Sequence, residues 1–290
     1  MTTKAGVIGH PVKHSLSPLM HEAAYKSLNL DWSYEAIDVS PENSPQEILD
    51  LFVSGYKGLN VTMPLKNDAF NIGKAHGAAA RLQIANTLIS VDSEIHCYST
   101  DGEGFVKSLR DQNINIDNCS FLVVGAGGAS RSICDALVNN RAEVLVTARK
   151  LDASTQLVED VLSSNRSENE NRLLIDVVDY SKRDEVIQSC DVIVNATPVG
   201  MTIDSVKDNA TPINTENISE NHVVVDTIYH PLETQLLKEA KSRGARTING
   251  IEMLIYQGAL SFKLMTGLDA PIDVMREAIN QHLQGRSNEH

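Results

Sequence analysis

One stretch near the middle of the chain restricts the fold more than any other, because it joins an apolar run directly to a glycine-rich turn and then to a helix-like run. Residues 121–138 read FLVVGAGGASRSICDALV. Apolar residues that end at a glycine are typical of a buried strand, and the apolar spacing after the turn is typical of a helix. A strand, a glycine turn and a helix in this order form the first unit of a doubly wound sheet. We therefore expect an α/β fold with a parallel sheet.

The residues that follow continue this alternation. Strand-like apolar runs are separated by helical or polar stretches and lie at 143–149, 173–178, 191–197 and 222–229. Two polar segments, 163–172 and 204–221, are expected to be surface loops. This part of the chain is thus predicted to be an independent doubly wound domain.

The first part of the chain has a strand–helix alternation of its own. Strand-like runs lie at 5–9, 34–39 and 58–63, with helix-like runs between them at 18–30 and 44–55. Ser44, Pro45 and Glu47 predict a capping box at the start of the second helix, and Gly55 predicts its end.

The end of the chain completes the predicted organisation. Helix-like runs at 250–267 and 271–283 have no strand between them, so they must pack on a sheet formed earlier. We predict two domains with a boundary near residue 102. The first is an N-terminal α/β domain, and the second is a Rossmann-type domain with a doubly wound parallel sheet.

The composition limits the partners of the protein. Its 290 residues carry a formal net charge of −13, which argues against binding nucleic acid or an anionic membrane through a basic surface. No apolar stretch is long enough to span a membrane and the start lacks the apolar core of a signal peptide, so we expect a cytoplasmic protein. The four cysteines contain no CxxC pair, so we expect neither a metal site nor disulfides and interpret them as buried small apolar residues.

The glycine turn has the context of a dinucleotide site. Gly125, Gly127 and Gly128 stand between the strand and the helix, where the backbone can approach a pyrophosphate at the helix N-terminus. Ser130 occupies the place of the usual third glycine, a position that mainly governs how closely the helix packs on the sheet. A tight turn without a ligand is the alternative.

The end of the next strand predicts which dinucleotide binds. An acidic residue there would accept a hydrogen bond from the ribose 2′-hydroxyl of NAD. This chain has Arg149 and Lys150 instead, whose cationic donors suit a 2′-phosphate, so the sequence favours NADP. The alternative is a solvated basic pair with Asp152 nearby.

A lysine in the first part of the chain stands where positive charge is disfavoured. The motif NVTMPLK, residues 60–66, places Lys66 in the first turn of a predicted helix whose first residue is Pro64. Because the helix dipole destabilises an ammonium there, Lys66 is predicted to exchange its proton near neutral pH, with Asp101 as the partner that orients it. The alternatives are a surface lysine at 66 and helix caps at Asp101 and Ser17.

Six motifs together carry a resemblance to a known family. In chain order they are HSLSP, NVTMPLK, STDG, GAGGASR, NATPVGM and YQGALSF. Their order and spacing over nearly the whole chain resemble the shikimate dehydrogenase family. The resemblance implies an enzyme that uses NADPH to reduce 3-dehydroshikimate reversibly to shikimate in aromatic amino-acid biosynthesis. It also implies that Lys66 and Asp101 are the catalytic pair and serve proton transfer.

The resemblance further implies the residues that bind each ligand. A small polyhydroxylated acid needs many fixed polar groups and little apolar surface. The implied substrate-binding residues are Ser15 and Ser17 for the carboxylate and Asn60, Thr62, Asn86 and Gln257 for the ring hydroxyls, with Tyr229 nearby. The implied NADP-binding residues are Gly125, Ala126, Gly127, Gly128, Ala129, Ser130, Arg149, Lys150, Thr197, Met201 and Gly250. The implied domains are 1–101 with 250–290 for the substrate and 102–249 for NADP, in a monomer or homodimer whose partners are small molecules.

Two departures from the family pattern leave alternatives open. Ser99 stands where the family usually has asparagine before Thr-Asp-Gly, which removes an amide beside Asp101. Ala148, Arg149 and Lys150 stand where NADP-dependent members usually have Asn-Arg-Thr, so only the arginine is kept. The alternatives are a quinate/shikimate dehydrogenase with relaxed substrate choice or NAD use, and a non-catalytic dinucleotide-binding regulator.

Overall fold

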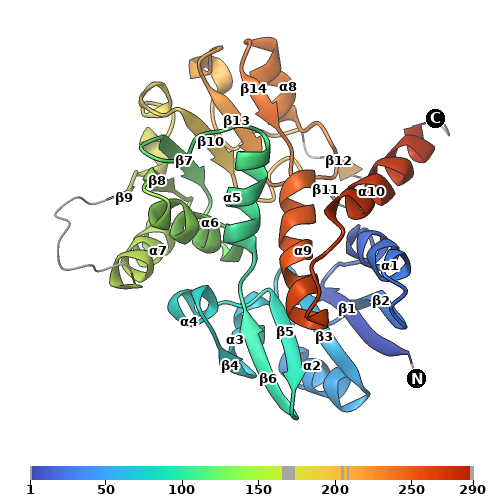
Figure 1. Ribbon diagram of the computed structural model, residues 1–290. Helices are drawn as coiled ribbons and strands as arrows, with labels where there is room; N and C mark the ends of the chain where they lie inside the picture. Colours follow the sequence, from blue (N-terminus) through green and yellow to red (C-terminus); the bar gives the residue numbers. More distant parts are fainter. Residues whose placement is uncertain (1, 165–173, 204–205, 208, 288–290) are drawn as a thin grey trace. The chain divides into compact units, whose positions relative to one another are not determined.

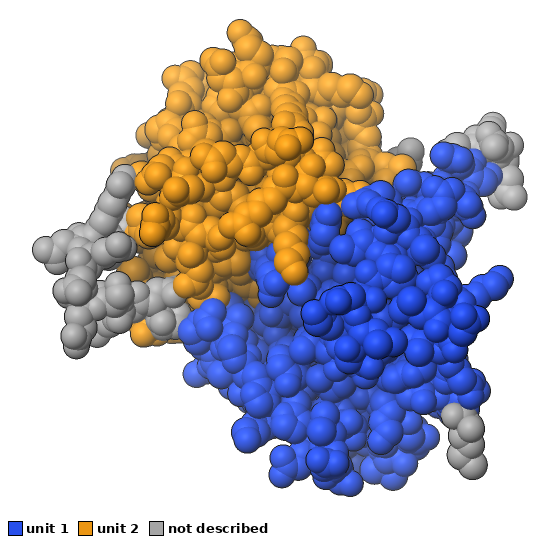
Figure 2. All heavy atoms as spheres, viewed as in Figure 1, with its two compact units in different colours: residues 1–104, 254–290 blue, residues 105–253 orange. Residues whose placement is uncertain are grey.

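The computed structural model of the protein describes residues 2–164, 174–203, 206–207 and 209–287 (Figure 1). The chain divides into two compact units, coloured separately in Figure 2. Unit 1 comprises residues 1–104 and 254–290, and unit 2 comprises residues 105–253. Within the described residues, each unit contains one six-stranded sheet.

The first three strands of unit 1 are parallel and form one side of its sheet. Their order is β2-β1-β3, with β1 at Thr3–Gly9, β2 at Trp32–Asp38 and β3 at Tyr56–Val61. Helices α1 (Ser17–Ser27) and α2 (Ser44–Val53) connect them. The predicted βαβαβ order is therefore confirmed.

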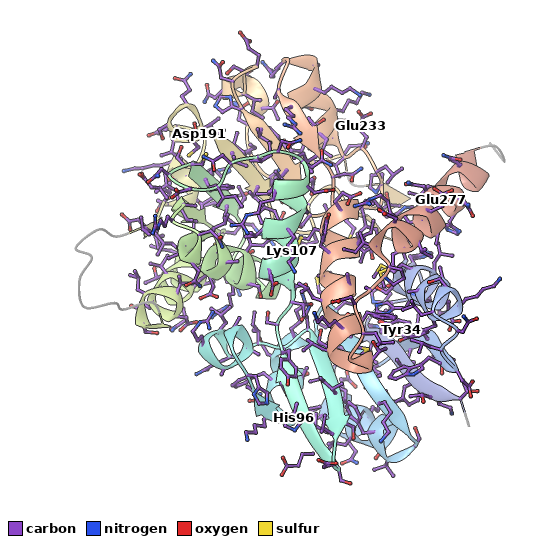
Figure 3. All side chains as sticks on the ribbon, viewed as in Figure 1. Tyr34, His96, Lys107, Asp191, Glu233 and Glu277 are labelled. Carbon is purple, nitrogen blue, oxygen red and sulfur yellow. The ribbon has the colours of Figure 1, made fainter. Side chains whose placement is uncertain are left out.

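The other side of this sheet was not predicted. Strand β5 (Thr87–Val91) runs antiparallel to β3, and β6 (Glu94–Tyr98) runs antiparallel to β5. The two-residue strand β4 (Lys74–Ala75) pairs with β6 at the edge, between the short helices α3 (Lys66–Asn71) and α4 (Ala78–Leu82). Unit 1 thus has a mixed sheet. In Figure 3, the labels Tyr34 and His96 mark its strands β2 and β6.

Two predicted helix starts were wrong in detail. Helix α2 begins at Ser44, but the Ser44 hydroxyl donates to the carboxylate of Asp68 and makes no cap to the helix, so there is no capping box. An ionised carboxylate is a strong acceptor, so the hydroxyl is directed at Asp68 and its oxygen accepts no hydrogen bond from the first N–H groups of the helix. Helix α3 begins at Lys66, so Pro64 precedes the helix and is not its first residue.

The C-terminal helices α9 (Ile251–Thr266) and α10 (Ile272–Ser287) agree with the two predicted helices. Helix α10 contacts α1, and α9 lies against β3, where a Cβ added at Gly58 would be 2.5 Å from Cγ of Met265. The lack of a side chain at this glycine lets the helix approach the strand closely.

Unit 2 has an all-parallel sheet in the order β14-β13-β10-β7-β8-β9. The strands are β7 (Ser120–Val124), β8 (Glu143–Thr147), β9 (Ile175–Val177), β10 (Val192–Asn195), β13 (Val223–Asp226) and β14 (Arg246–Ile248). The helices are α5 (Asp101–Asp111), which begins in unit 1, α6 (Gly128–Asn139), α7 (Leu151–Ser164) and α8 (Gln235–Ser242). Read from β9, this is the Rossmann order, and the direction of winding reverses between β7 and β10.

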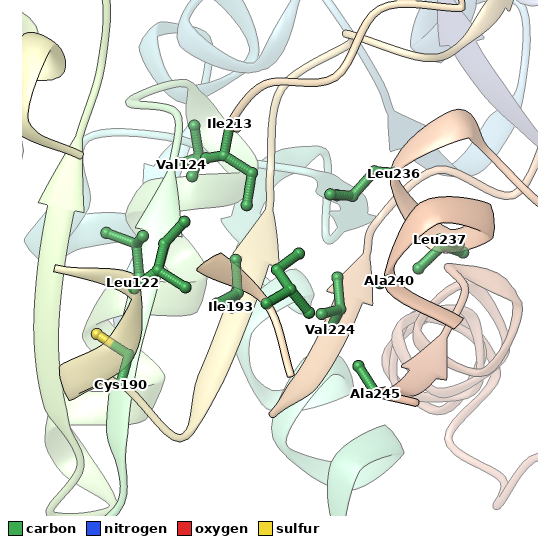
Figure 4. Close-up of a cluster of buried hydrophobic side chains, with 12 residues drawn as sticks. Leu122, Val124, Cys190, Ile193, Ile213, Val224, Leu236, Leu237, Ala240 and Ala245 are labelled. Atoms are coloured by element: carbon green, nitrogen blue, oxygen red, sulfur yellow. The ribbon is translucent and has the colours of Figure 1, made fainter. Parts of the chain in front are cut away.

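The core of unit 2 explains why these strands read as continuous apolar runs. Figure 4 shows Leu122, Ile193 and Val224 from the three central strands, together with Leu236 and Leu237 of α8. All five side chains are buried. Strands of a parallel sheet that are covered by helices on both faces need apolar residues at successive positions.

The two polar segments predicted to be surface loops differ in how they compare with the structure. Most of the predicted loop at 163–172 lies outside the described residues. The predicted loop at 204–221 contains β12 (Val206–Lys207), which pairs with β11 (Thr202–Ile203), and a 3₁₀ turn at Thr215–Asn217. Two further 3₁₀ turns lie at Tyr180–Lys182 and Ile187–Ser189. Within the described residues, no helix combines the length and apolarity that crossing a membrane requires.

The cysteines agree with the prediction except at one position. Cys97, Cys134 and Cys190 are buried as predicted, whereas Cys119 is partly exposed just before β7. The description of Cys119 as a buried residue was therefore wrong.

Candidate functional site

The topology of unit 1 brings three chain segments together. Asn60 near the end of β3 pairs with Thr87 at the start of β5, and Thr87 also pairs with Tyr98 at the end of β6. Because β5 runs antiparallel to both neighbours, its start lies beside their ends. The residues just beyond these points are Lys66, Asn86 and Asp101, which explains how residues distant in sequence converge.

Lys66 and Asp101 form an ion pair. The Lys66 Nζ lies 2.5 Å from Asp101 Oδ2, and the side chains are only 15% and 9% exposed. The other carboxylate oxygen, Oδ1, accepts a hydrogen bond of 2.8 Å from Asn86 Nδ2. Asp101 is the first residue of α5, yet its two oxygens are held by these partners, so it is more than a helix cap.

Asn86 is itself fixed in orientation. Its Oδ1 accepts from the backbone N–H of Thr100 at 2.7 Å, and its Nδ2 lies 2.9 Å from Thr100 Oγ1. An amide whose oxygen is held by a backbone donor presents its NH₂ group on the opposite side. This arrangement aims a donor at Asp101 without an asparagine at position 99.

Asn60 is the second fixed amide. Its Oδ1 accepts from the Tyr34 hydroxyl at 2.7 Å and from Ser261 Oγ at 3.2 Å, and its Nδ2 donates to Thr87 Oγ1 at 3.2 Å. Burial raises the pKa of Tyr34 well above its ordinary value, so the phenol stays protonated and keeps donating. The ring of Tyr34 stacks on that of His21, with the centroids 4.2 Å apart.

His21 is a buried aromatic support for this group. Its side chain is 0% exposed, and neither ring nitrogen has a hydrogen-bond partner among the described residues. Burial lowers the pKa of His21 to about 3, so the ring is neutral at physiological pH. A neutral ring can stack on Tyr34 without bringing a charge into the core.

Helix α9 adds Gln257 on the same face as Ser261. Gln257 Oε1 lies 3.4 Å from Asn86 Nδ2, and its Nε2 donates to the carbonyl of Leu254 at 2.8 Å. A Cβ added at Gly104 would be 2.6 Å from the backbone nitrogen of Gln257. The start of α5 and the middle of α9 are thus in close backbone contact.

The remaining predicted substrate residues of unit 1 make local contacts. The backbone N–H of Ser17 donates to Ser15 Oγ at 3.3 Å, and Ser17 is buried. The N-cap residue of helix α1 is Leu16, so Ser17 is not the cap of this helix. Thr62 follows β3 and its methyl group lies against Gly9. The described hydrogen bonds do not join these three hydroxyls to the Lys66–Asp101 pair.

The glycine turn of unit 2 has the shape that a pyrophosphate requires. Gly125 has φ +122°, a region that favours glycine, and a Cβ there would be 2.8 Å from the carbonyl oxygen of Ala196. Gly127 caps the N-terminus of α6, and a Cβ there would meet nothing within 4 Å. The backbone is therefore open on the side where a ligand can approach the first N–H groups of α6.

Ser130 and the residues around it complete this turn. Ser130 is fully buried in the first turn of α6, and its hydroxyl donates to the carbonyl of Ala196 at 3.4 Å. Ala126, Gly128 and Ala129 are partly buried beside it. The site fits a dinucleotide phosphate by its donors and its space.

Arg149 and Lys150 follow the end of β8. Both side chains are exposed, and no described residue pairs with either. Two unpaired cations at the end of the strand next to β7 are placed where a ribose 2′-phosphate would need donors.

The loops after β10, β13 and β14 hold the remaining predicted residues of unit 2. The Thr197 hydroxyl donates to Asn195 Oδ1 at 2.7 Å, and the backbone N–H of Gly250 donates to the Ile228 carbonyl at 2.9 Å. Met201 is partly buried in the loop after β10, and Tyr229 is partly buried in the loop after β13. Tyr229 thus lies in unit 2, whereas the other predicted substrate residues lie in unit 1.

Beneath these loops lies a buried carboxylate, Asp226, at the end of β13. It accepts hydrogen bonds from Asn195 Nδ2, the Ile228 N–H and the Thr234 hydroxyl at 3.1, 3.0 and 2.7 Å. Burial raises the pKa of Asp226 to about 6, although the three hydrogen bonds act in the opposite direction. Among the described residues, no group of three or more His, Cys, Asp or Glu is arranged to hold a metal ion.

Comparison with known proteins gives consistent results along the chain. Residues 7–88 match the shikimate dehydrogenase substrate binding domain, 108–231 match shikimate / quinate 5-dehydrogenase, and 250–279 match the shikimate 5′-dehydrogenase C-terminal domain. The shikimate dehydrogenase (NADP⁺) of Methanosphaera stadtmanae is 38% identical over 287 residues, which is 98% of both chains. This chain belongs to the shikimate dehydrogenase family.

Solved structures of shikimate dehydrogenases have the same fold. One, in complex with NADP⁺, aligns with a TM-score of 0.87 and 36% identity over 97% of this chain and 96% of its own. Another, from Thermus thermophilus in complex with NADP(H) and shikimate, aligns with a TM-score of 0.83 and 34% identity over 96% of this chain and 99% of its own. The fold class is that of the family, with an N-terminal substrate-binding domain and a Rossmann-type domain.

Sequence reasoning missed several residues of the hydrogen-bonded group around Lys66 and Asp101 in unit 1 and of the group around the loops after β10 and β13 in unit 2. In unit 1 they are His21, Tyr34, Thr87, Thr100 and Ser261; in unit 2 they are Asn195, Asp226 and Thr234. Asn195 and Asp226 end apolar runs, a position where polar residues of a parallel sheet often face the ligand. Ser261 lies four residues after Gln257 on one helix face. No comparable signal marks His21 or Tyr34, because both sit in apolar patterns.

Proposed function

We propose that this protein is an NADP-dependent oxidoreductase that acts on a CH–OH group and reversibly reduces 3-dehydroshikimate to shikimate. The observation that carries the proposal is the Lys66–Asp101 ion pair, held by Asn86, in a chain that belongs to the shikimate dehydrogenase family. A buried ion pair costs desolvation energy, so its position among fixed polar groups suits chemistry better than stability.

Lys66 and Asp101 serve proton transfer in this proposal. NADPH, when bound, supplies the hydride that reduces the substrate carbonyl. The Lys66 ammonium hydrogen-bonds to the carbonyl oxygen and gives it a proton as the C–O bond becomes a hydroxyl; in the reverse direction the lysine amine takes that proton back. Asp101 orients the lysine and balances its charge.

The polar residues of unit 1 position the substrate. Asn60, Thr62, Asn86 and Gln257 supply donors and acceptors for the ring hydroxyls, and Ser15 and Ser17 bind the carboxylate. The fixed amides of Asn60 and Asn86 support this role, because their orientations are set before a ligand arrives. Tyr229 is a further proposed substrate-binding residue.

The proposed NADP site uses the turn and strand ends of unit 2. The backbone of 125–130 and the N-terminus of α6 bind the pyrophosphate, and Arg149 and Lys150 bind the 2′-phosphate. Thr197, Met201 and Gly250 lie on the nicotinamide side. The absence of an acidic side chain at 149 and 150 supports NADP over NAD.

The proposal also assigns the domains and the setting. Residues 1–101 with 250–290 bind the substrate, and residues 102–249 bind NADP. The reaction belongs to aromatic amino-acid biosynthesis in the cytoplasm. The partners are small molecules, and the protein acts as a monomer or homodimer.

A quinate/shikimate dehydrogenase with relaxed cofactor use is the second candidate, because the family model that matches 108–231 covers both substrates and Lys150 departs from the family pattern. Nicotinamide absorbance during incubation with shikimate or quinate, each with NADP or NAD, separates the two. Reduction mainly with shikimate and NADP supports the first proposal. Efficient turnover of quinate or NAD supports the second, and no reduction under any pairing contradicts both.

A further inference from the structure

We propose that Asp226 is a positioning residue for the nicotinamide side of the site: its carboxylate fixes the conformations of the loops that follow β10 and β13. The inference rests on the proposed function for its consequence in catalysis. Asp226 touches neither substrate nor cofactor in this proposal and acts through its neighbours.

Strand register places Asp226 beside Asn195. The two strands are parallel and adjacent, and Asn195 pairs with Asp226 as the last residue of each. Both side chains are 0% exposed. The carboxylate and the amide therefore face each other at the carboxyl edge of the sheet, on one side of the point where the winding reverses.

Asn195 connects Asp226 to the loop that follows β10. Its Nδ2 donates both to Asp226 Oδ1 and to the carbonyl of Val199, each at 3.1 Å. Its Oδ1 accepts from the backbone N–H and the hydroxyl of Thr197. One amide thus holds both ends of a turn that contains Thr197 and leads to Met201. The carbonyl of Ala196 in this turn is the group that lies against Gly125.

Asp226 holds the second loop directly. Its Oδ1 also accepts from the Ile228 N–H, one residue before Tyr229. The Ile228 carbonyl accepts from the N–H of Gly250, and a Cβ at Gly250 would collide with the Thr227 carbonyl. The backbone N–H of Thr202 donates to the carbonyl of His230 at 3.1 Å, which links the two loops.

The other oxygen of Asp226 anchors the cluster to a helix. Oδ2 accepts from the Thr234 hydroxyl, and Thr234 Oγ1 in turn accepts from the N–H of Leu237 as the N-cap of α8. All three partners of the carboxylate donate to it, so the acceptor-only ionised form matches them fully. Among the described residues, no lysine or arginine pairs with Asp226, so these donors alone stabilise the charge.

These contacts connect every predicted nicotinamide-side residue to one carboxylate. Thr197 and Met201 lie in the turn that Asn195 holds, and Gly250 is bonded to the loop that Asp226 starts. Misplacement of reacting groups by about 1 Å can reduce turnover about a hundredfold. Loss of the carboxylate should therefore slow the reaction more than it weakens cofactor binding, which depends on the glycine turn and α6.

The test uses Asp226→Asn, which keeps the shape of the side chain but turns an acceptor into a donor facing Thr234. Asp191→Asn is the matched control. Asp191, labelled in Figure 3, is the residue before β10, so it lies at the amino end of this strand and Asp226 lies at the carboxyl end of the next one. Its carboxylate accepts hydrogen bonds from Ser120. Thr234→Val removes a single bond to Asp226 and serves if Asp226→Asn folds poorly.

Two measurements are made on each full-length variant. Amide hydrogen exchange, without substrate, should be faster over 196–201 and 227–230 in Asp226→Asn and unchanged in Asp191→Asn. In the dehydrogenase assay, kcat with shikimate and NADP should fall about tenfold or more while the Kd of NADP changes less than about threefold. A merely structural role would lower the unfolding temperature without separating kcat from NADP affinity.

The two arms distinguish the failure of the inference from that of the proposed function. An inactive wild-type protein contradicts the proposed function, while the exchange arm still decides whether Asp226 orders the loops. Exchange and kcat that match the Asp191→Asn control in both Asp226→Asn and Thr234→Val overturn the inference.

Discussion

Among single residues, Lys66 offers a direct test of the proposed proton transfer. Lys66→Ala should lower kcat at least about a hundredfold, since proton transfer by a positioned side chain contributes about 10²–10⁴. The Kd of NADP should stay nearly unchanged, because the proposed NADP residues lie in unit 2. Steady-state kinetics and NADP binding measure the two effects.

A matched control for Lys66 is available nearby. Lys74, on the edge strand β4, is an exposed lysine for which the described residues offer no partner, so Lys74→Ala should leave turnover unchanged. Circular dichroism checks that both variants fold. Full activity in Lys66→Ala would exclude the proposed proton-transfer role.

His21 makes stability depend on pH in a predictable direction. Its pKa falls from 6.5 to about 3 on folding because burial disfavours the charged ring. Between these two pKa values, His21 binds a proton in the unfolded chain but not in the folded protein. The free energy of unfolding therefore decreases as the pH falls below 6.5. The loss is about 1.4 kcal/mol for each pH unit between the two pKa values.

Replacing His21 by phenylalanine should remove this term, because Phe keeps an aromatic ring against Tyr34 and has no nitrogen to protonate. Between pH 7.5 and 5.5, the free energy of unfolding of the wild type should fall about 1.4 kcal/mol more than that of His21→Phe. Denaturant titrations at the two pH values measure the difference. His282→Gln, at an exposed histidine, should retain the wild-type slope; equal slopes for wild type and His21→Phe would contradict the assignment.

At the scale of helices, the contact between α5 and α9 depends on Gly104. A Cβ there would lie 2.6 Å from the Gln257 nitrogen and 2.8 Å from its Cα, so backbone has to move. Gly104→Ala should reduce stability by about 1–3 kcal/mol, as overpacking does. It should also raise KM for shikimate, because Gln257 is displaced, and leave NADP affinity unchanged.

The control for this contact is Gly285→Ala on α10, where a Cβ meets nothing within 4 Å. It should be neutral or stabilising by up to about 1 kcal/mol, the helix propensity difference. Thermal unfolding and shikimate kinetics distinguish the variants. A Gly104→Ala protein as stable as the Gly285→Ala protein would contradict the predicted role of Gly104.

The elements differ in how far sequence predicted them, and the reasons are physical. The strands β7, β10 and β13 are buried on both faces, so their apolar runs were recognised. The hairpin β5–β6 was missed because Asp92 and Ser93 turn it with φ of 49° and 66°. Without Asn-Gly or a similar pair, the sequence lacks the strongest hairpin signal.

The site was predicted unevenly for a related reason. Lys66 and Asp101 stand at element starts within distinctive motifs, and the structure brings them together. The supporting residues are identified only by partners distant in sequence, such as Ser261 with Asn60 and Thr234 with Asp226. A one-dimensional pattern carries no information about such pairs until the strand register is known.

In the complete protein, we expect each ligand to slow hydrogen exchange in the unit that binds it. Unit 1 contains the Lys66–Asp101 pair and the fixed amides, and unit 2 contains the glycine turn and the basic pair after β8. A ligand that binds only the folded state stabilises what it binds, by about 2.7 kcal/mol at one hundred times its Kd. The protected segments therefore report where each ligand sits.

Hydrogen exchange with one ligand at a time tests this division. NADP alone should slow exchange at 121–131 and 147–152, where backbone N–H groups and the basic pair would meet its phosphates. Shikimate alone should slow exchange at 60–66, 84–88 and 98–104, which contain Lys66, Asn86 and Asp101. Protection of the unit 1 segments by NADP, with none in unit 2, would contradict the assignment of substrate and cofactor. The Arg149→Ala variant should lose protection with NADP at 147–152 but keep it at 121–131, because the proposed sites for the pyrophosphate and the 2′-phosphate are at the ends of different strands.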